Sequence, residues 1–181
     1  MQNSTSLAAT PTLKRRLICL VYEAFLVTAV VMLGMLVFLL FAKLINADAQ
    51  SAFVYYGRTI VLFVVAGAYF IHCWTGSGHT LAMKTWRIKL VKVGYANVPF
   101  KSAMLRYVFG WGWVLPALVV CFAFGIHGKA QVAIAVALGV VAWGLTAFLD
   151  KDRQFLHDKL AGTRLISLPK PVKVVKVPTA A

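Results

Sequence analysis

Acidic residues are scarce in this chain of 181 residues, which holds 5 aspartates and glutamates against 19 lysines and arginines and has a formal net charge of +14. In a soluble protein, so large a positive excess would indicate nucleic-acid binding. Here the basic residues lie between long apolar runs instead of gathering in one basic tract. Membrane topology explains that distribution better, and we expect no nucleic-acid partner.

Recognisable catalytic and metal-binding motifs are also missing. The sequence has no nucleophile elbow, no glycine-rich phosphate loop and no HExxH motif. His157 and Asp158 are neighbours, but adjacency in sequence does not make a catalytic pair. The spacing of His72, Cys73 and His79 is too loose for a metal motif. We therefore expect neither an enzyme nor a bound metal or other cofactor.

Cysteine is rare as well. The three cysteines, Cys19, Cys73 and Cys121, all lie in apolar runs. An odd number without paired spacing gives no disulfide framework and no zinc knuckle. We interpret these cysteines as small hydrophobic side chains.

Apolar sequence, by contrast, is abundant: 61% of the residues are hydrophobic, whereas a soluble domain has about 45–50%. A helix needs about 20 residues to cross the hydrocarbon core. Four runs meet this requirement, and we predict spans at residues 17–42, 53–74, 107–126 and 132–149. The predicted fold is an all-α membrane protein, a four-helix transmembrane bundle.

The predicted organisation is a disordered segment at 1–13, a transmembrane domain at 14–168 and a flexible basic tail at 169–181. Lys14-Arg15-Arg16 and the "ADA" at 47–49 resemble a signal peptide and its cleavage site. However, the first apolar run is longer than the h-region of about 7–15 residues that such peptides carry. We therefore interpret it as a span.

Basic residues predict the orientation. Sixteen of the lysines and arginines lie before the first span, in the 75–106 segment or in the tail; the other three are Lys43, Arg58 and Lys129. Cytoplasmic segments carry the excess of such residues. We expect a multi-pass protein of the cell (inner) membrane with both termini in the cytoplasm.

The third predicted span contains Pro116, which crowds the carbonyl of Gly112 four residues earlier and predicts a kink. The kink could be simple packing geometry, or it could be a broken helix that offers a carbonyl to an ion or substrate. In the fourth span Ala135 and Gly139 share one face, which suits close helix contact within one chain or between copies.

Two cytoplasmic segments change to a period of two, "TWRIKLVKV" at 85–93 and "TRLISL" at 163–168. We predict that they form a small cytoplasmic two-strand element. Because a lone ribbon is marginal in water, it should rest on the helix ends. A compatible alternative is an interfacial segment whose lysines contact anionic lipid.

The first span contains one carboxylate, Glu23, about 9 Å along the helix from residue 17. Arg16 is close to two turns earlier and so shares its face. Further candidate partners are His72, His79 and Arg106. A buried carboxyl beside a cation can titrate near neutral pH. Glu23 could therefore belong to a structural ion pair, a proton or cation site, or a contact with a partner subunit or lipid headgroup.

Three further stretches carry a family resemblance. Arg15-Arg16 precedes the acid of the first span, "GHTLAMKTWRIKLV" follows the second span with "AMLRY" beyond it, and "RQFLHDKLAGTRLI" follows the last. Together, over residues 14–168, they resemble the RDD family of bacterial integral membrane proteins. That family is named for one arginine and two aspartates.

The resemblance places the arginine at Arg15 or Arg16 and the second aspartate at Asp158. Glu23 occupies the first aspartate position, a departure that keeps the charge type. The implied function is transport of an ion or small ligand, with proton-coupled cation exchange as its sharpest form. The hypothetical ion or proton site is Glu23, Arg16 and Asp158.

The remaining candidate partners of that site are Arg15, His72, His79, Arg106 and His157. The alternative function is a structural or assembly subunit whose in-membrane charges pair between helices. Four short spans enclose little interior, so a transporter would be expected to act as a homo-oligomer.

Overall fold

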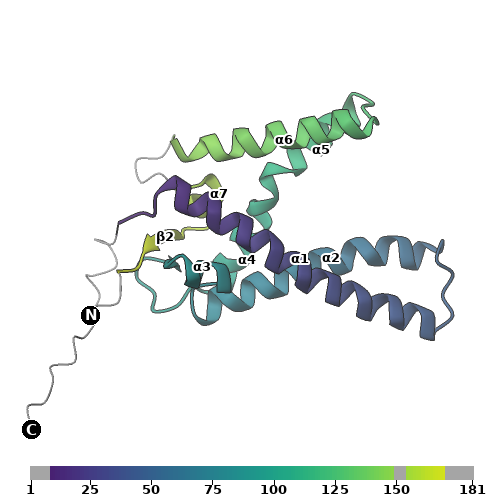
Figure 1. Cartoon of the computed structure of the whole chain (residues 1–181), viewed down its shortest axis with the longest axis horizontal. Helices are drawn as coiled ribbons and strands as arrows, with labels where there is room; N and C mark the ends of the chain where they lie inside the picture. The colour runs from purple at the N-terminus through teal and green to yellow at the C-terminus, as the bar shows by residue number, and fades with distance from the viewer. Residues whose placement is uncertain (1–8, 149–153, 170–181) are drawn as a thin grey trace, which may run out of the picture.

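The computed structural model describes residues 9–148 and 154–169. Two helical hairpins extend in the same direction from a small common base (Figure 1). The predicted disordered segment at 1–13 and basic tail at 169–181 lie largely outside the described residues.

The first hairpin consists of α1 (Leu13–Leu44) and α2 (Ala52–Gly76). Both helices begin with a hydroxyl cap, since Thr12 accepts from the Arg15 amide and Ser51 accepts from the Val54 amide. The helices approach closely at Gly34, where an added Cβ would lie 2.8 Å from Val65 Cγ2. Glycine there lets the two backbones pack against each other.

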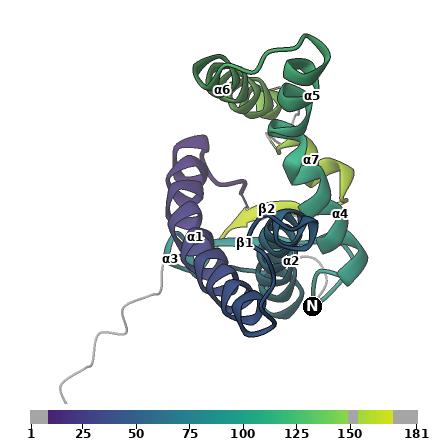
Figure 2. The same cartoon turned by 90° about the vertical axis from the view of Figure 1, so that its right-hand side faces the viewer.

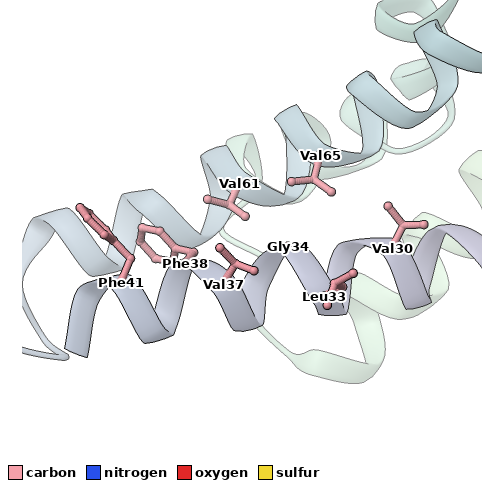
Figure 3. A pocket seen from close by; sticks show the side chains of 8 residues that line it. All are labelled: Val30, Leu33, Gly34, Val37, Phe38, Phe41, Val61 and Val65. Atoms are coloured by element: carbon pink, nitrogen blue, oxygen red, sulfur yellow. The ribbon is translucent and has the colours of Figure 1, made fainter. Parts of the chain in front are cut away.

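An open groove runs between these helices towards the far end of the hairpin (Figure 3). Its volume is ≈ 620 Å³. All of its lining residues are apolar or glycine: Val30, Leu33, Gly34, Val37, Phe38, Phe41, Val61 and Val65. The groove therefore suits contact with lipid chains or apolar side chains.

The third predicted span is a bent pair. It contains α4 (Phe100–Gly110), the 3-10 turn η1 (Trp111–Trp113) and α5 (Leu115–Ala123). The two halves bend by 44° at the break. Pro116 lies in the first turn of α5, where its missing N–H costs no hydrogen bond. The predicted kink is therefore present, immediately before the proline.

The second hairpin pairs α5 with α6 (Lys129–Leu145), which continues into η2 (Thr146–Phe148). Gly139 of α6 faces the η1 turn: an added Cβ would collide with the Trp113 carbonyl oxygen and contact Ala117. The predicted small-residue face is thus used at this position within one chain.

Among the described residues, three helices are long and apolar enough to cross a membrane, and the bent pair makes a fourth candidate. The spans are close to those predicted, except that the third helix begins earlier, at Phe100. The predicted four-helix bundle is not confirmed, because the two hairpins diverge from their base instead of packing along their length (Figures 1 and 2).

The predicted strand pair is present. β1 (Ile88–Val91) and β2 (Arg164–Ser167) are antiparallel, with Leu90 opposite Leu165. Ile88 and Leu90 are each 1% exposed because the alternation turns them towards the core. With the short helices α3 (Leu81–Thr85) and α7 (Leu156–Leu160), the strands form what we call the basal layer, residues 81–91 and 156–167.

Candidate functional site

One face of α1 carries polar residues inward. Arg16, Cys19 and Glu23 are buried, at spacings of three and four residues that place them on one side of the helix. Most other α1 side chains around them are exposed and apolar, including Leu17, Leu20 and Phe25. The helix therefore presents a narrow polar stripe to the protein and an apolar surface to its surroundings.

Glu23 is bound by two hydroxyl groups. Tyr69 Oη of α2 donates to Oε1 at 2.8 Å, and Thr80 Oγ1 donates to Oε2. Thr80 also accepts from the Met83 amide and so caps α3. Glu23 is 7% exposed and forms no ion pair with any residue that the structure describes. The positive charge of Arg106 acts on it without a direct contact.

Arg106 instead pairs with Asp158. Its Nε lies 2.8 Å from Asp158 Oδ1, linking α4 to α7, and the Asp158 side chain is 0% exposed. The guanidinium also covers the Trp74 ring of α2, with 4.4 Å from Cζ to the ring centroid. Apart from this contact with Arg106, neither Asp158 carboxylate oxygen has a hydrogen-bond partner within 9–148 and 154–169. The pair is thus a buried charge contact between α4 and α7, and removal of either partner would leave the other charge buried without compensation.

A group of aromatic side chains connects the two hairpins at the base. The His157 ring is nearly parallel to the Trp143 ring of α6 and to the Phe155 ring, with interplanar angles of 7° and 11° and centroid distances of 6.2 Å and 5.6 Å. Arg16 of α1 covers the Phe155 ring at 4.6 Å. Trp143 Nε1 donates to His157 Nδ1 at 3.2 Å.

His157 is held neutral by its surroundings. Burial lowers its pKa from 6.5 to about 4; Asp158 opposes this shift, whereas Arg106 and Arg16 add to it. A neutral ring leaves Nδ1 free to accept the Trp143 hydrogen bond. The 3.7 Å contact between His157 Nε2 and Asp158 Oδ1 is therefore not an ion pair at neutral pH.

The other predicted partners lie elsewhere. Arg15 donates to Ser167 Oγ at 3.2 Å and to the Trp86 carbonyl, so it joins α1 to the basal layer. His72 is exposed on α2. Burial and the nearby Lys89 and Lys84 lower the pKa of His79, which precedes α3. Neither histidine bonds to Glu23 in the described part of the chain.

Tyr69, Thr80, Trp143 and Phe155 were not among the site residues predicted from sequence. Tyrosine and tryptophan within apolar runs usually have a buried partner for their polar tip, which was the available signal for Tyr69 and Trp143. Thr80 lies before a short helix, and its capping position was readable. Its bond to Glu23 was not, because the two residues are far apart in sequence.

Buried polar residues thus gather where the first hairpin meets the basal layer. The site offers one carboxyl held by hydroxyls, one carboxylate held by a guanidinium, and a neutral imidazole. No group of three or more His, Cys, Asp or Glu side chains that could hold a metal occurs within the described ranges. The Glu23 carboxyl, with a hydroxyl at each oxygen, can take up or release a proton.

No curated protein and no solved structure matches the chain. The model of the RDD family matches residues 10–162, most of the chain and all the site residues named above. Glu23 and Asp158, which the resemblance assigns to the family's two aspartates, and Arg16, one of its two candidates for the arginine, are all buried. With its apolar helices long enough to span a bilayer, the chain belongs to the RDD family of membrane proteins.

Proposed function

We propose that this membrane protein couples proton movement to the movement of a cation, with Glu23 as the proton-binding carboxyl. The observation that supports the proposal is the pair of neutral donors, Tyr69 and Thr80, on a buried carboxyl with no ion-pair partner in the described chain. A carboxyl fixed to a neighbouring cation would remain charged. A carboxyl held by hydroxyls can take up and release a proton while keeping oxygen partners.

The position of Glu23 suits this role. It lies about 9 Å along α1 from Leu17, where the apolar run of the helix begins. Ionisable residues at membrane depth are costly and commonly mark ion pathways or proton relays. Arg106 is near enough to attract the ionised form, yet it is anchored to Asp158 and cannot neutralise Glu23 permanently.

We further propose that the carrier is a homo-oligomer. The groove between α1 and α2 is lined by apolar side chains and glycine and cannot carry a hydrated cation. A polar path would need surfaces contributed by a second copy.

The basic residues favour an orientation with both termini in the cytoplasm of the cell that inserts the protein.

A reporter test addresses the orientation. A reporter fused at Lys129, the first residue of α6, should read as external, and one fused at the C-terminus as cytoplasmic. A cytoplasmic signal at Lys129 would contradict the proposed orientation.

A second candidate function is an assembly subunit without transport activity. The buried Arg106–Asp158 pair favours it, because interhelical charge pairs also serve to hold membrane domains together. This candidate predicts that every buried charge affects stability and that none affects ion flux.

Proteoliposomes carrying a pH gradient and different monovalent cations distinguish the two functions. We expect cation-dependent proton flux that Glu23→Gln abolishes while the protein still folds and inserts. Tyr69→Phe should retain flux but move its half-maximal pH upward, because the ionised carboxylate loses a donor. Asp48→Asn, which removes an exposed carboxylate from the α1–α2 loop, is the matched control and should retain wild-type flux.

Absence of flux under every gradient, with Glu23→Gln destabilising the protein, would favour the assembly subunit. Flux that persists unchanged in Glu23→Gln would remove Glu23 from the mechanism.

A further inference from the structure

A small pocket at the edge of the basal layer remains outside the proposed transport site. Its volume is ≈ 330 Å³, and it is lined by Arg15, Thr85, Trp86, Arg87 and Leu168. Two arginines therefore line one hollow, one from the start of α1 and one from the turn between α3 and β1.

Arg15 lines this pocket and pairs with no carboxylate among the described residues. Its two terminal nitrogens donate to the Ser167 hydroxyl and to the backbone carbonyls of Trp86 and Arg87, all neutral acceptors. These bonds fix the guanidinium in place. A fixed guanidinium that faces no carboxylate is prepared to bind an anion.

Arg87 is held in an unusual backbone conformation. Its φ of 53° lies in the left-handed region, which non-glycine residues rarely adopt. Its amide donates to the Lys84 carbonyl, and its own carbonyl accepts from the Leu168 amide at 2.9 Å. Such conformations persist where the surrounding structure imposes them, and they concentrate at binding sites. The strained turn directs the chain so that Arg87 lines the same pocket as Arg15.

The described carboxylates are all engaged elsewhere. Glu23 is bound by Tyr69 and Thr80, and Asp158 pairs with Arg106. Asp48 lies in the loop at the opposite end of α1 (Figure 1). The two arginines of the pocket therefore have no acidic partner in the part of the chain that the structure describes.

We propose that this pocket binds a phosphate group, with Arg15 and Arg87 as its ligands. Arginine presents N–H groups in a planar fork that matches phosphate oxygens. The phosphate would come from the headgroup of an anionic phospholipid or from free phosphate. The site shares no residue with Glu23 and its donors and does not depend on the proposed function.

The surroundings favour a lipid source. Arg15 is in the first turn of α1, and the exposed apolar surface of that helix begins immediately afterwards with Leu17 and Leu20, which are 49% and 54% exposed. Basic groups at the start of an apolar helix lie at the depth of lipid headgroups. A lipid bound there would place its phosphate in the pocket and its chains along α1.

Thermal unfolding of the full chain in detergent tests the site. Phosphatidylglycerol should raise the Tm of the wild-type protein more than the same amount of phosphatidylcholine. Arg87→Gln should lose more than half of that lipid-specific rise. Lys84→Gln removes the same charge from an exposed position close by and is the matched control, which should keep most of the rise.

The second part of the experiment measures the Tm with inorganic phosphate and no added lipid. If phosphatidylglycerol raises the Tm and phosphate does not, the site binds lipid. If phosphate raises the Tm and phosphatidylglycerol does not, the ligand is soluble. Equal losses in Arg87→Gln and Lys84→Gln would show diffuse attraction and overturn the site, as would no response to either compound. If Arg87→Gln does not fold, Arg87→Lys keeps the charge without the fork. It should show a smaller rise than the wild type, and an equal rise would overturn the proposal.

Discussion

The two hairpins differ in how they are held. The first, α1–α2, packs its polar stripe onto the basal layer and buries Arg16 and Glu23. In the second, α6 buries no residue and α5 buries Cys121 alone. At its base the second hairpin is joined through the bent α4–α5 connection and through the hydrogen bond from Trp143 to His157.

This difference shows that a hairpin can be long and apolar enough to enter a membrane without being fixed to the base by buried polar contacts. Both hairpins are apolar enough to enter a membrane. The first is also fixed by hydrogen bonds and charges, which fail if their geometry changes. We therefore expect the first hairpin and the basal layer to behave as one rigid unit and the second hairpin to move more independently.

The largest expected effect comes from breaking the charge pair beneath the first hairpin. Asp158→Ala leaves Arg106 buried without its carboxylate, and we expect a loss of about 3–5 kcal/mol in the free energy of unfolding. Thermal unfolding in detergent measures it. Asp48→Asn, at the exposed loop, should change stability by less than about 0.5 kcal/mol. Equal, small effects of the two changes would show that the base does not depend on this pair.

Acid should loosen the link to the second hairpin. The pKa of His157 is about 4 in the folded chain against an ordinary 6.5. The unfolded chain binds more protons between these values, so stability is fully present above pH 6.5 and falls as the pH decreases towards 4. The loss amounts to about 3 kcal/mol.

Unfolding measured from pH 7 to pH 4 tests this, since a protonated Nδ1 can no longer accept from Trp143. His157→Gln should flatten this part of the pH dependence. His127→Gln, in the exposed loop between α5 and α6, should leave it as in the wild type. The same pH dependence in both variants would exclude His157 as the responsible group.

The smallest expected effect on stability tests whether the second hairpin unfolds independently of the first. Gly139→Ala places a methyl group against the Trp113 carbonyl, and we expect a cost of about 1–3 kcal/mol. Hydrogen exchange should quicken in α5 and α6 and remain unchanged in α1 and α2. Gly144→Ala is the matched control on the same helix, because its added methyl meets nothing within 4 Å. Faster exchange in both hairpins would indicate one cooperative bundle.

Sequence reasoning reached the strand pair, the kink before Pro116 and the burial of the acid Glu23, because each depends on a local pattern or on a charge that stands out in an apolar run. It did not reach the partners of Glu23. Tyr69 and Thr80 carry no charge, and they meet Glu23 only once α1, α2 and α3 have packed.

The closed bundle was expected because four apolar runs suggest four helices that pack together. Apolar runs specify entry into lipid, however, and do not specify which helices touch, because lipid tails are as apolar as the side chains. The bend between η1 and α5 separates the second hairpin from the first, and its 44° angle cannot be read from Pro116 alone.

The pairing of β1 with β2 also has a consequence for biosynthesis. β1 follows the first two spans, whereas β2 follows the last, and Asp158 lies close before β2. While the ribosome is still making the second hairpin, β1 has no partner and Arg106 has no carboxylate. The basal layer is therefore completed after every span has been synthesised, and a chain that stops before residue 158 leaves its membrane helices without the base that orders them.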